Sequence, residues 1–273
     1  MIRRIPPAFM ERPWGVDNLG PWFPPPAART GEVRFQIEPP LPLLTKLIFT
    51  SERLSVQVHP NDAQARELGL ENGKTEMWYV ICAEPGATLA LGFRSAISAE
   101  QARAAALSGA ILDLLDWIPA HAGDTFLVPA GTVHAIGAGL TICEIQQNSD
   151  TTYRLFDYGR GRELHLENGL AVSRLTPGEP QPAPRVTSAP WTEVAACAYF
   201  VTEIATLDSV YRHPAAGDEF KLLVVLEGSG RIAGQPYRAG DCWLAEAAAE
   251  GFTVEPESPT RVLRSGPGRG LLS

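Results

Sequence analysis

Short apolar runs separated by glycine and proline extend through most of this chain and limit what it can fold into. The 273 residues include 25 Gly and 24 Pro, which leaves little room for long helices. Apolar alternation of strand length is found at residues 44–48, 54–58, 77–82, 88–91, 125–128 and 140–146. Strands of this length between such breakers predict an antiparallel sandwich or barrel, and an all-β fold class.

Two segments depart from the strand rhythm and predict helices. Residues 62–68 have the composition of a short helix. Residues 98–117 are rich in alanine and repeat apolar residues at helical intervals, and Ser98 and Gln101 have the spacing of a capping box. The second segment is expected to be a small helical insertion in the β fold.

A weak internal repeat predicts two barrels in tandem. Residues 76–92 resemble 220–234, with Glu76 aligned to Phe220, and residues 123–128 resemble 240–245. We expect a metal-binding catalytic barrel at 1–175, a proline-rich linker at 176–186 and a second, degenerate barrel at 187–273. No histidine in the second copy matches His134, so we expect no metal there. Simple β-sheet similarity without common ancestry is the alternative.

Charge and composition narrow the partners and the compartment. The formal net charge of −8 argues against nucleic acid and anionic membranes, which require clustered Lys and Arg. No segment is long and apolar enough to cross a bilayer, and no signal-peptide core follows the N-terminus. The four cysteines lack the spacing of a disulfide or metal framework. We expect a soluble, cytoplasmic protein with reduced thiols.

Metal-binding side chains lie on separate strand patterns. Ser55, Gln57 and His59 are two residues apart and therefore share one face of a strand. Lys74 and Glu76 share a face in the same way. A tight glycine turn precedes His134, and a further strand adds Glu144, whereas His121, His165 and His213 are in contexts that favour the surface. Imidazole, carboxylate and amide ligands suit zinc with one position open for substrate.

The motifs at 55–62, 73–79, 129–136 and 148–160, with Glu-Arg-Pro-Trp-Gly at 11–15, together resemble the type I mannose-6-phosphate isomerases in their short bacterial form. The resemblance covers about residues 8–175. It implies tandem cupin-type (jelly-roll) barrels and one zinc ion, held in the first barrel by Gln57, His59, Glu76 and His134. It also implies that Arg154 is an active-site residue. The sequence departs from the family in its short, divergent C-terminal part and in Asn61, where many relatives have Asp.

The resemblance to this family implies that the protein interconverts mannose 6-phosphate and fructose 6-phosphate through an enediol. Either Lys74 or Glu144 is then the acid/base, because Glu76 would be occupied by the metal. Zinc nearby would favour the neutral amine of Lys74. We expect Ser55, Lys74 and Arg154 to contact the sugar phosphate, and a salt bridge with Asp150 or Asp157 is the structural alternative for Arg154.

Two other functions are compatible with the same motifs. One is a non-catalytic cupin that binds a sugar phosphate and regulates a partner. The other is a different metal-dependent cupin enzyme, for example one that uses Fe(II) and oxygen. Lys74, Glu144 and Arg154 favour the isomerase over the first, and the glutamine ligand disfavours the second. The expected partner is a small-molecule sugar phosphate. The expected oligomeric state is a monomer or a homodimer.

Overall fold

The protein is built mainly of β-strands, as the sequence predicts, in a computed structural model that describes residues 1–179, 181, 183–215 and 217–268. Within these residues there are four short helices, α1 (Asp62–Glu67), α2 (Ala99–Ser108), α3 (Ile111–Leu114) and α4 (Leu166–Val172). The strands are β1 (Ile2–Ile5), β2 (Ala8–Val16), β3 (Thr30–Phe35), β4 (Leu43–Thr50), β5 (Val56–Val58), β6 (Glu76–Ala83), β7 (Thr88–Phe93), β8 (Leu115–Pro119), β9 (Thr125–Val128), β10 (His134–Ile136), β11 (Leu140–Gln147), β12 (Tyr153–Phe156), β13 (Arg185–Ser188), β14 (Trp191–Ala196), β15 (Phe200–Leu207), β16 (Tyr211–His213), β17 (Lys221–Glu227), β18 (Ser229–Ile232), β19 (Gln235–Arg238), β20 (Cys242–Ala245), β21 (Phe252–Pro256) and β22 (Thr260–Pro267).

The helices begin where the sequence predicts them. Asn61 and Gln64 form a capping box on α1, and Ser98 and Gln101 form the predicted one on α2. The helical segment is shorter than expected, because Gly109 takes a left-handed conformation (φ 83°) that ends α2. After the short α3, residues 115–119 form strand β8 instead of continuing a helix. The insertion is therefore two helices and a strand.

The chain divides into two compact units. One comprises residues 12–16 and 48–181, and the other comprises 1–11, 17–47 and 182–273, so the division passes within β2 and β4. N-terminal residues expected in the catalytic domain thus group with the C-terminal part. The domain boundaries expected at residues 175 and 187 stay a prediction.

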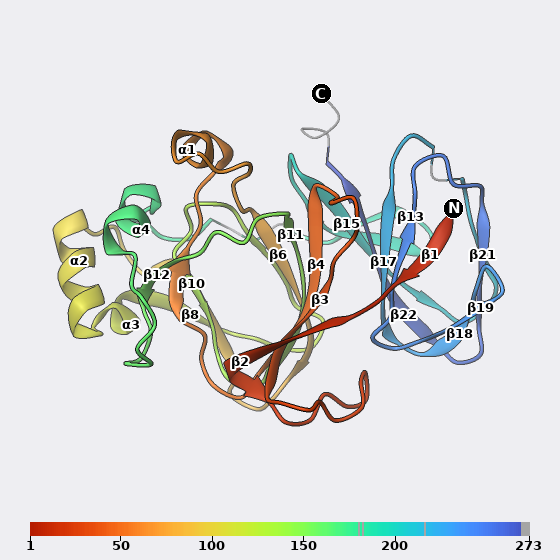
Figure 1. The fold of residues 1–273 in the computed structure, drawn as a ribbon, viewed down its shortest axis with the longest axis horizontal. Coiled ribbons are helices and arrows are strands. Elements are labelled where there is room, and N and C mark those ends of the chain that lie inside the picture. The colour runs from red at the N-terminus through yellow and green to blue at the C-terminus, as the bar shows by residue number, and fades with distance from the viewer. Residues whose placement is uncertain (180, 182, 216, 269–273) are drawn as a thin grey trace. The chain divides into compact units, whose positions relative to one another are not determined.

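The unit at 48–181 contains what we call the first barrel. One of its sheets has the order β12-β5-β10-β7-β8, and β11, β6 and β9 run side by side in the other. Apolar side chains from both sheets, including Trp78, Leu89 and Ile142, fill the space between them. Helices α2, α3 and α4 lie together outside the β12-β5-β10 sheet (Figure 1), where a second apolar cluster forms.

Strict alternation sorts the side chains of the first barrel. Val56 and Val58 of β5 and Ala135 of β10 belong to the cluster beneath the helices, whereas Ile136 belongs to the barrel interior. Residues at the intervening positions of β5, including Gln57, therefore point into the barrel. This alternation directs polar side chains into an otherwise apolar interior.

The other unit contains what we call the second barrel. Its four-stranded sheet has the order β16-β21-β18-β19, and β20, β17, β22 and β15 are neighbours within a seven-stranded sheet, β1-β20-β17-β22-β15-β14-β13. Trp191, Leu223, Trp243, Phe252 and Val262 belong to the apolar cluster that these strands enclose. The second barrel therefore has a continuous core of its own.

The two barrels repeat the same backbone hydrogen bonds. In the first, the amide of Gly123 donates to the carbonyl of Val80 and the amide of Val80 donates to the carbonyl of Asp124. In the second, Gly240, Val225 and Asp241 make the same two bonds. Gly123 and Gly240 have φ of 95° and 92°, and each following aspartate accepts a backbone N–H three residues before it. The predicted repeat is thus present in the ladder geometry.

The ladder also corrects the alignment by one residue. Glu76 pairs with Val128, and Lys221 pairs with Ala245 at the equivalent step of the second barrel. Lys221, and not Phe220, therefore matches Glu76. The alignment made from the sequence missed this because most of the matched residues in the two segments are apolar. Such segments match equally well when one is shifted by one residue.

His213 is also not at the surface, where the sequence placed it. Only 4% of the residue is exposed, and its ring stacks on Phe252 with centroids 4.6 Å apart. The reason is that β16 pairs with β21 and so brings His213 opposite Phe252. His121 is exposed and His165 is half-buried.

None of the four cysteines, which all lie among the described residues, is in a disulfide; Cys143 and Cys242 are buried, Cys197 is half-buried and Cys82 is exposed. Among the described helices, none combines the length and the hydropathy needed to span a membrane.

Candidate metal centre

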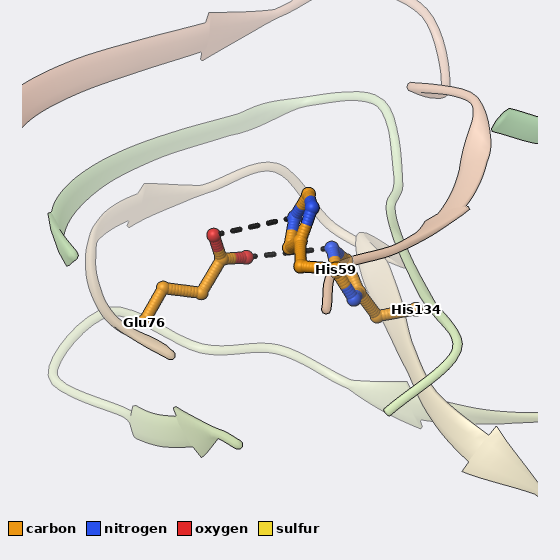
Figure 2. Close-up of side chains that lie close together, drawn as sticks. All are labelled: His59, Glu76 and His134. Atoms are coloured by element: carbon orange, nitrogen blue, oxygen red, sulfur yellow. Dashed lines mark ion pairs between the residues drawn. The ribbon is translucent and has the colours of Figure 1, made fainter. Parts of the chain in front are cut away.

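His59, Glu76 and His134 form a compact, fully buried group in the first barrel (Figure 2). Their candidate ligand atoms all lie within 4.8 Å of one another, and each residue is at most 1% exposed. Glu76 Oε2 is 3.5 Å from His59 Nε2, and Glu76 Oε1 is 3.3 Å from His134 Nε2. One carboxylate therefore faces two imidazoles, the kind of donor set that zinc takes.

The strand pairing explains why residues so distant in sequence meet. His134 lies directly opposite Gln57 in the β10–β5 ladder, and directly opposite residues project to the same face of a sheet. His59, two positions after Gln57, is on this inward face. Glu76 begins β6, which belongs to the other sheet of the barrel. The site therefore joins the two sheets across the interior.

The surroundings of His134 favour its neutral form. Burial lowers the pKa of His134 to about 4; the hydrogen bond to Thr132 opposes this, and the charge of Lys74 lowers the pKa further. His134 Nδ1 lies 2.9 Å from the carbonyl oxygen of Thr132, to which it can only donate. The proton is thereby kept on Nδ1, so Nε2 presents a lone pair towards Glu76, as a metal ligand must.

Lys74 is the nearest cation to the group. Its Nζ lies 3.0 Å from His59 Nε2 and 3.1 Å from Glu76 Oε2, and the residue is 5% exposed. Two of the candidate ligand atoms are therefore already arranged around a positive charge. The geometry brings the predicted amine to the centre of the site.

Gln57 and Ser55 extend the site along β5. The Gln57 amide nitrogen is 3.2 Å from His134 Nε2, and the Ser55 hydroxyl donates to Gln57 Oε1 at 3.3 Å. Half a turn of the terminal amide exchanges its nitrogen and oxygen, which would present an oxygen beside the His134 ring. The position of Gln57 is therefore compatible with a fourth ligand.

Glu144 lies on the same inward face as Glu76, since it pairs with Trp78, two positions along β6. The indole nitrogen of Trp78 donates to Glu144 Oε2 at 3.0 Å, and Glu144 is 4% exposed. Its charge acts on His134, whose pKa it raises. A second buried carboxylate is thus held close to the group.

Arg154 completes a row of inward-facing side chains, because it lies opposite Gln57 on the other side from His134. Its Nε is buried without a hydrogen-bond partner, and in the described part of the chain its guanidinium makes no ion pair. Asp157, the salt-bridge partner considered from the sequence, is held by Arg162 at 2.5 and 2.7 Å. Burial, followed by the charge of Arg162, lowers the pKa of Arg154.

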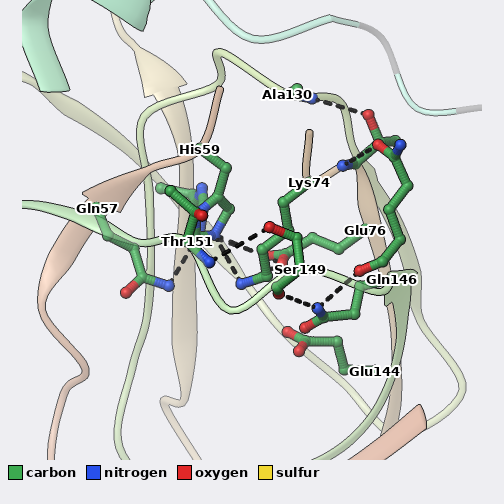
Figure 3. A network of polar contacts seen from close by, with 12 residues as sticks. Gln57, His59, Lys74, Glu76, Ala130, Glu144, Gln146, Ser149 and Thr151 are labelled. Atoms are coloured by element: carbon green, nitrogen blue, oxygen red, sulfur yellow. Dashed lines mark hydrogen bonds and ion pairs between the residues drawn. The ribbon is translucent and has the colours of Figure 1, made fainter. Parts of the chain in front are cut away.

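Several supporting residues were not singled out from the sequence. Trp78, Thr132, Asp62, Thr75 and Gln147 hold the predicted site residues or the backbone that carries them. Figure 3 shows part of this network around Lys74, Glu76, Gln146 and Ser149. Asp62 closes the motif at 55–62 and Gln147 directly precedes the motif at 148–160, so a position in or next to a motif is the signal that could have found them.

The donor set fits a divalent metal. Two imidazoles and one carboxylate are buried, converge on one point and belong to rigid strand ends, and an amide is adjacent. Nitrogen and oxygen ligands of this kind suit zinc better than calcium or magnesium, which prefer oxygen alone. In the described residues this is the one such His/Cys/Asp/Glu group.

Comparison with curated proteins finds several similar isomerases. The chain is 38% identical over 237 residues to the mannose-6-phosphate isomerase ManA of Bacillus subtilis, covering 78% of this chain and 72% of that protein. It is 42% identical over 204 residues to the mannose-6-phosphate isomerase of Streptococcus mutans, and this match covers 70% of the chain but 62% of that enzyme. No protein-family model matches the chain.

Solved structures agree over nearly the whole chain. The mannose 6-phosphate isomerase of Bacillus subtilis superposes with a TM-score of 0.83 at 27% identity, covering 96% of this chain and 98% of that one. A zinc-bound mannose 6-phosphate isomerase has a TM-score of 0.74 at 15% identity, with 98% and 99% coverage, and so shows the fold. The predicted cupin-type fold is confirmed.

Proposed function

The chain belongs to the mannose-6-phosphate isomerase family, and we propose that it interconverts mannose 6-phosphate and fructose 6-phosphate with zinc as its cofactor. The observation that carries the proposal is the buried group of two imidazoles and a carboxylate with an amine in contact with it.

The proposed ligands of the single zinc ion are Gln57, His59, Glu76 and His134. The bound metal would polarise the substrate carbonyl and stabilise the charge that develops on its oxygen. The four side chains come from three strand segments whose registers are set by ladder pairing, so they need little reorganisation. Preorganised ligands of this kind favour a fixed coordination number with a position left for substrate.

The reaction moves a proton between C2 and C1 of the open-chain sugar. A base removes the C2 proton, the electron pair forms the C1–C2 double bond, and the C1 carbonyl pair moves to O1, which takes up a proton to give the enediol. Loss of the O2 proton then forms the C2 carbonyl as the double-bond pair takes up a proton at C1. Lys74 and Glu144 remain the two candidates, and both are buried at the site. A positioned acid/base of this kind contributes on the order of 10²–10⁴ in rate.

We propose that Arg154 and Ser55, together with Lys74, contact the substrate. Arg154 faces into the barrel with a guanidinium that forms no ion pair within the described chain. Arg162 and Arg12 add positive charge around it, and Asp157 and Glu163 add negative charge. Such a cation would bind the phosphate or the enediolate. Local positive charge is needed because the chain as a whole has a net charge of −8.

A coupled assay for fructose 6-phosphate formed from mannose 6-phosphate tests the proposal directly. We expect activity in the purified protein, loss of activity on chelation and recovery when zinc is added back. Absence of activity in protein that contains stoichiometric zinc would overturn the isomerase and point to a sugar-phosphate-binding module. Recovery with Fe(II) alone, and only in the presence of oxygen, would point to the other cupin chemistry.

We further propose that the protein works in the cytoplasm. The wide spacing of the four cysteines, none of which lies in a C-x-x-C pair, supports this, since disulfide frameworks are rare in cytosolic proteins. The choice between a monomer and a homodimer stays a prediction.

A further inference from the structure

The backbone that carries the metal ligands is gathered from three segments of the first barrel. His59 ends the β5 segment, Glu76 begins β6, and the turn at 129–132 leads to His134. Two backbone bonds join them, from the Lys74 amide to the Pro60 carbonyl at 2.9 Å and from the Gly131 amide to the His59 carbonyl at 2.8 Å. The geometry of the site therefore depends on how these segments are held together.

A buried glutamine links two of the segments through its side chain. Gln147 Oε1 accepts from the Thr75 amide at 2.8 Å, and Gln147 Nε2 donates to Asp62 Oδ1 at 2.9 Å. The same Asp62 oxygen accepts from the Gly73 amide at 2.8 Å. Gln147 and Thr75 are 3% and 6% exposed, so these bonds are shielded from water.

Thr75 extends the link to the third segment. Its hydroxyl accepts from the amide of Ala130 at 3.2 Å, in the turn before His134 (Figure 3). Thr75 lies between Lys74 and Glu76 in sequence, so fixing its backbone fixes the directions of both neighbours. Gln147 itself points away from the inward face that Gln146 shares with Glu76. Its effect on the site therefore passes through backbone.

The approach between the first two segments is too close for a side chain. A Cβ added at Gly73 would lie 2.5 Å from the carbonyl carbon of Asn61 and 2.6 Å from the amide nitrogen of Asp62. Only glycine lets the two backbones come this near. The contact sets the distance between the segments, and the side-chain bonds set their register.

We propose that Asp62, Thr75 and Gln147 form a positioning clamp that holds the His59 and Lys74–Glu76 segments in the register that metal binding requires. The clamp residues are positioning residues, since none of them contributes a ligand atom. The inference rests on the proposed function only in taking the His59, Glu76 and His134 group as a metal site. Hydrogen-bonded support of this type is worth about 10–100-fold in metal affinity.

The decisive experiment exchanges the partners of the Gln147–Asp62 bond and measures zinc affinity by competition with a chromophoric chelator. Gln147→Leu removes both side-chain bonds, and Gln147→Glu places a carboxylate against Asp62. We expect each to weaken zinc binding about 10–100-fold. In the double variant Asp62→Asn with Gln147→Glu, the new amide at position 62 can donate to the new carboxylate at position 147 but no longer accepts from the Gly73 amide, so it should recover only part of the affinity that Gln147→Glu loses.

A matched control makes the same change elsewhere. Gln101→Leu removes the glutamine side chain of the α2 capping box, where Gln101 Oε1 accepts from the Ser98 amide at 2.8 Å, and should leave zinc affinity unchanged. Thermal unfolding of the metal-free proteins shows whether each variant folds. If Gln147→Leu does not fold, the exchange pair and Thr75→Val, which removes only the bond from Ala130, give the answer.

Unchanged zinc affinity in both Gln147 variants would overturn the clamp, and so would a double variant that binds zinc no more tightly than Gln147→Glu alone. These readouts require no substrate. A parent protein that binds zinc but does not isomerise the sugar phosphate would therefore refute the proposed function and leave the clamp standing.

Discussion

The two barrels have the same ladder but opposite charges at matching positions. Where the first has Glu76 and Lys74, the second has Lys221 and Glu219, and the pair is salt-bridged in both, at 3.1 and 2.6 Å. By the same register, Arg264 of the second barrel matches Glu144. A shared backbone therefore does not determine whether a barrel attracts a metal cation, because a few side chains decide the sign of the charge.

The two barrels also differ at the positions of the histidines His59 and His134. The amide of Gly137 donates to the carbonyl of Thr88, and the amide of Glu257 makes the equivalent bond to the carbonyl of Ser229. Three residues before each donor, Val254 of the second barrel therefore takes the position of His134. The strand paired with each of these residues then places His213 at the position of His59. The ring nitrogen Nε2 of His213 faces a nitrogen of Arg264 at 3.3 Å. The lone pair that a metal would use is thus directed at a guanidinium.

The second barrel replaces a metal with its own cations. Arg264 donates to Glu203 and lies 3.9 Å from the centre of the Trp191 ring. Lys221 and Arg264 both lower the pKa of His213, although burial lowers it most. Positive charge at these positions repels a divalent ion. The difference between the barrels teaches that charge reversal at the positions of Glu76 and Glu144, together with valine at the position of His134, accompanies the change from a cation site to a self-neutralised core.

The largest expected effect comes from the matched histidines. His59→Ala should reduce zinc from about one per chain to near zero and abolish isomerase activity, because a ligand is lost. His134→Ala should do the same. His213→Ala should keep both zinc and activity. Metal analysis by atomic emission and the coupled assay measure these results, and stoichiometric zinc in either of the first two variants would contradict the ligand assignment.

A smaller effect is expected from Arg154, which has no counterpart in the second barrel because no described strand lies beyond β16 in its sheet. Arg154→Ala should lower kcat by about 10²-fold as well as raise KM, if the guanidinium stabilises charge in the transition state. Arg154→Lys keeps the positive charge but loses the planar, bidentate guanidinium, and it should retain more activity than Arg154→Ala. Steady-state kinetics with an unchanged kcat would show that Arg154 only binds substrate.

The smallest effect concerns pH and the metal-free protein. Burial lowers the pKa of His134 in the folded protein from 6.5 to about 4. Between these two values the imidazole is protonated in the unfolded chain but neutral in the folded protein. The stability contributed by the neutral ring is therefore complete above pH 6.5 and is lost as the pH falls towards 4. Between about pH 7 and about pH 5 we expect a loss of about 2 kcal/mol from His134.

Urea unfolding in the presence of a chelator measures this dependence. His134→Phe should lose about 2 kcal/mol less than the parent over the same interval, since it removes the titrating ring. His213, whose pKa is lowered by burial in the second barrel, remains in both proteins and supplies a common background. Equal losses in parent and variant would show that His134 does not contribute.

Much of the fold was accessible from local patterns. The strands predicted at residues 77–82, 88–91, 125–128 and 140–146 are present as β6, β7, β9 and β11. Both predicted helices are present, and α2 begins at its predicted cap. The length of the helix predicted at residues 98–117 was wrong, because Gly109 was not recognised as the end of α2. Family membership was also predicted correctly, since ordered motifs with fixed spacing are specific in a way that composition is not.

For the site, a period of two determined which side chains could act together: Ser55, Gln57 and His59 on one strand, and Lys74 with Glu76 on another. The sequence by itself established this because alternation is a local property of extended backbone. The tertiary structure decided which strands face one another, that Lys221 and His213 match Glu76 and His59, and that Gln147 joins segments far apart in the chain. These facts depend on ladder register and long-range hydrogen bonds, which no short stretch of sequence encodes.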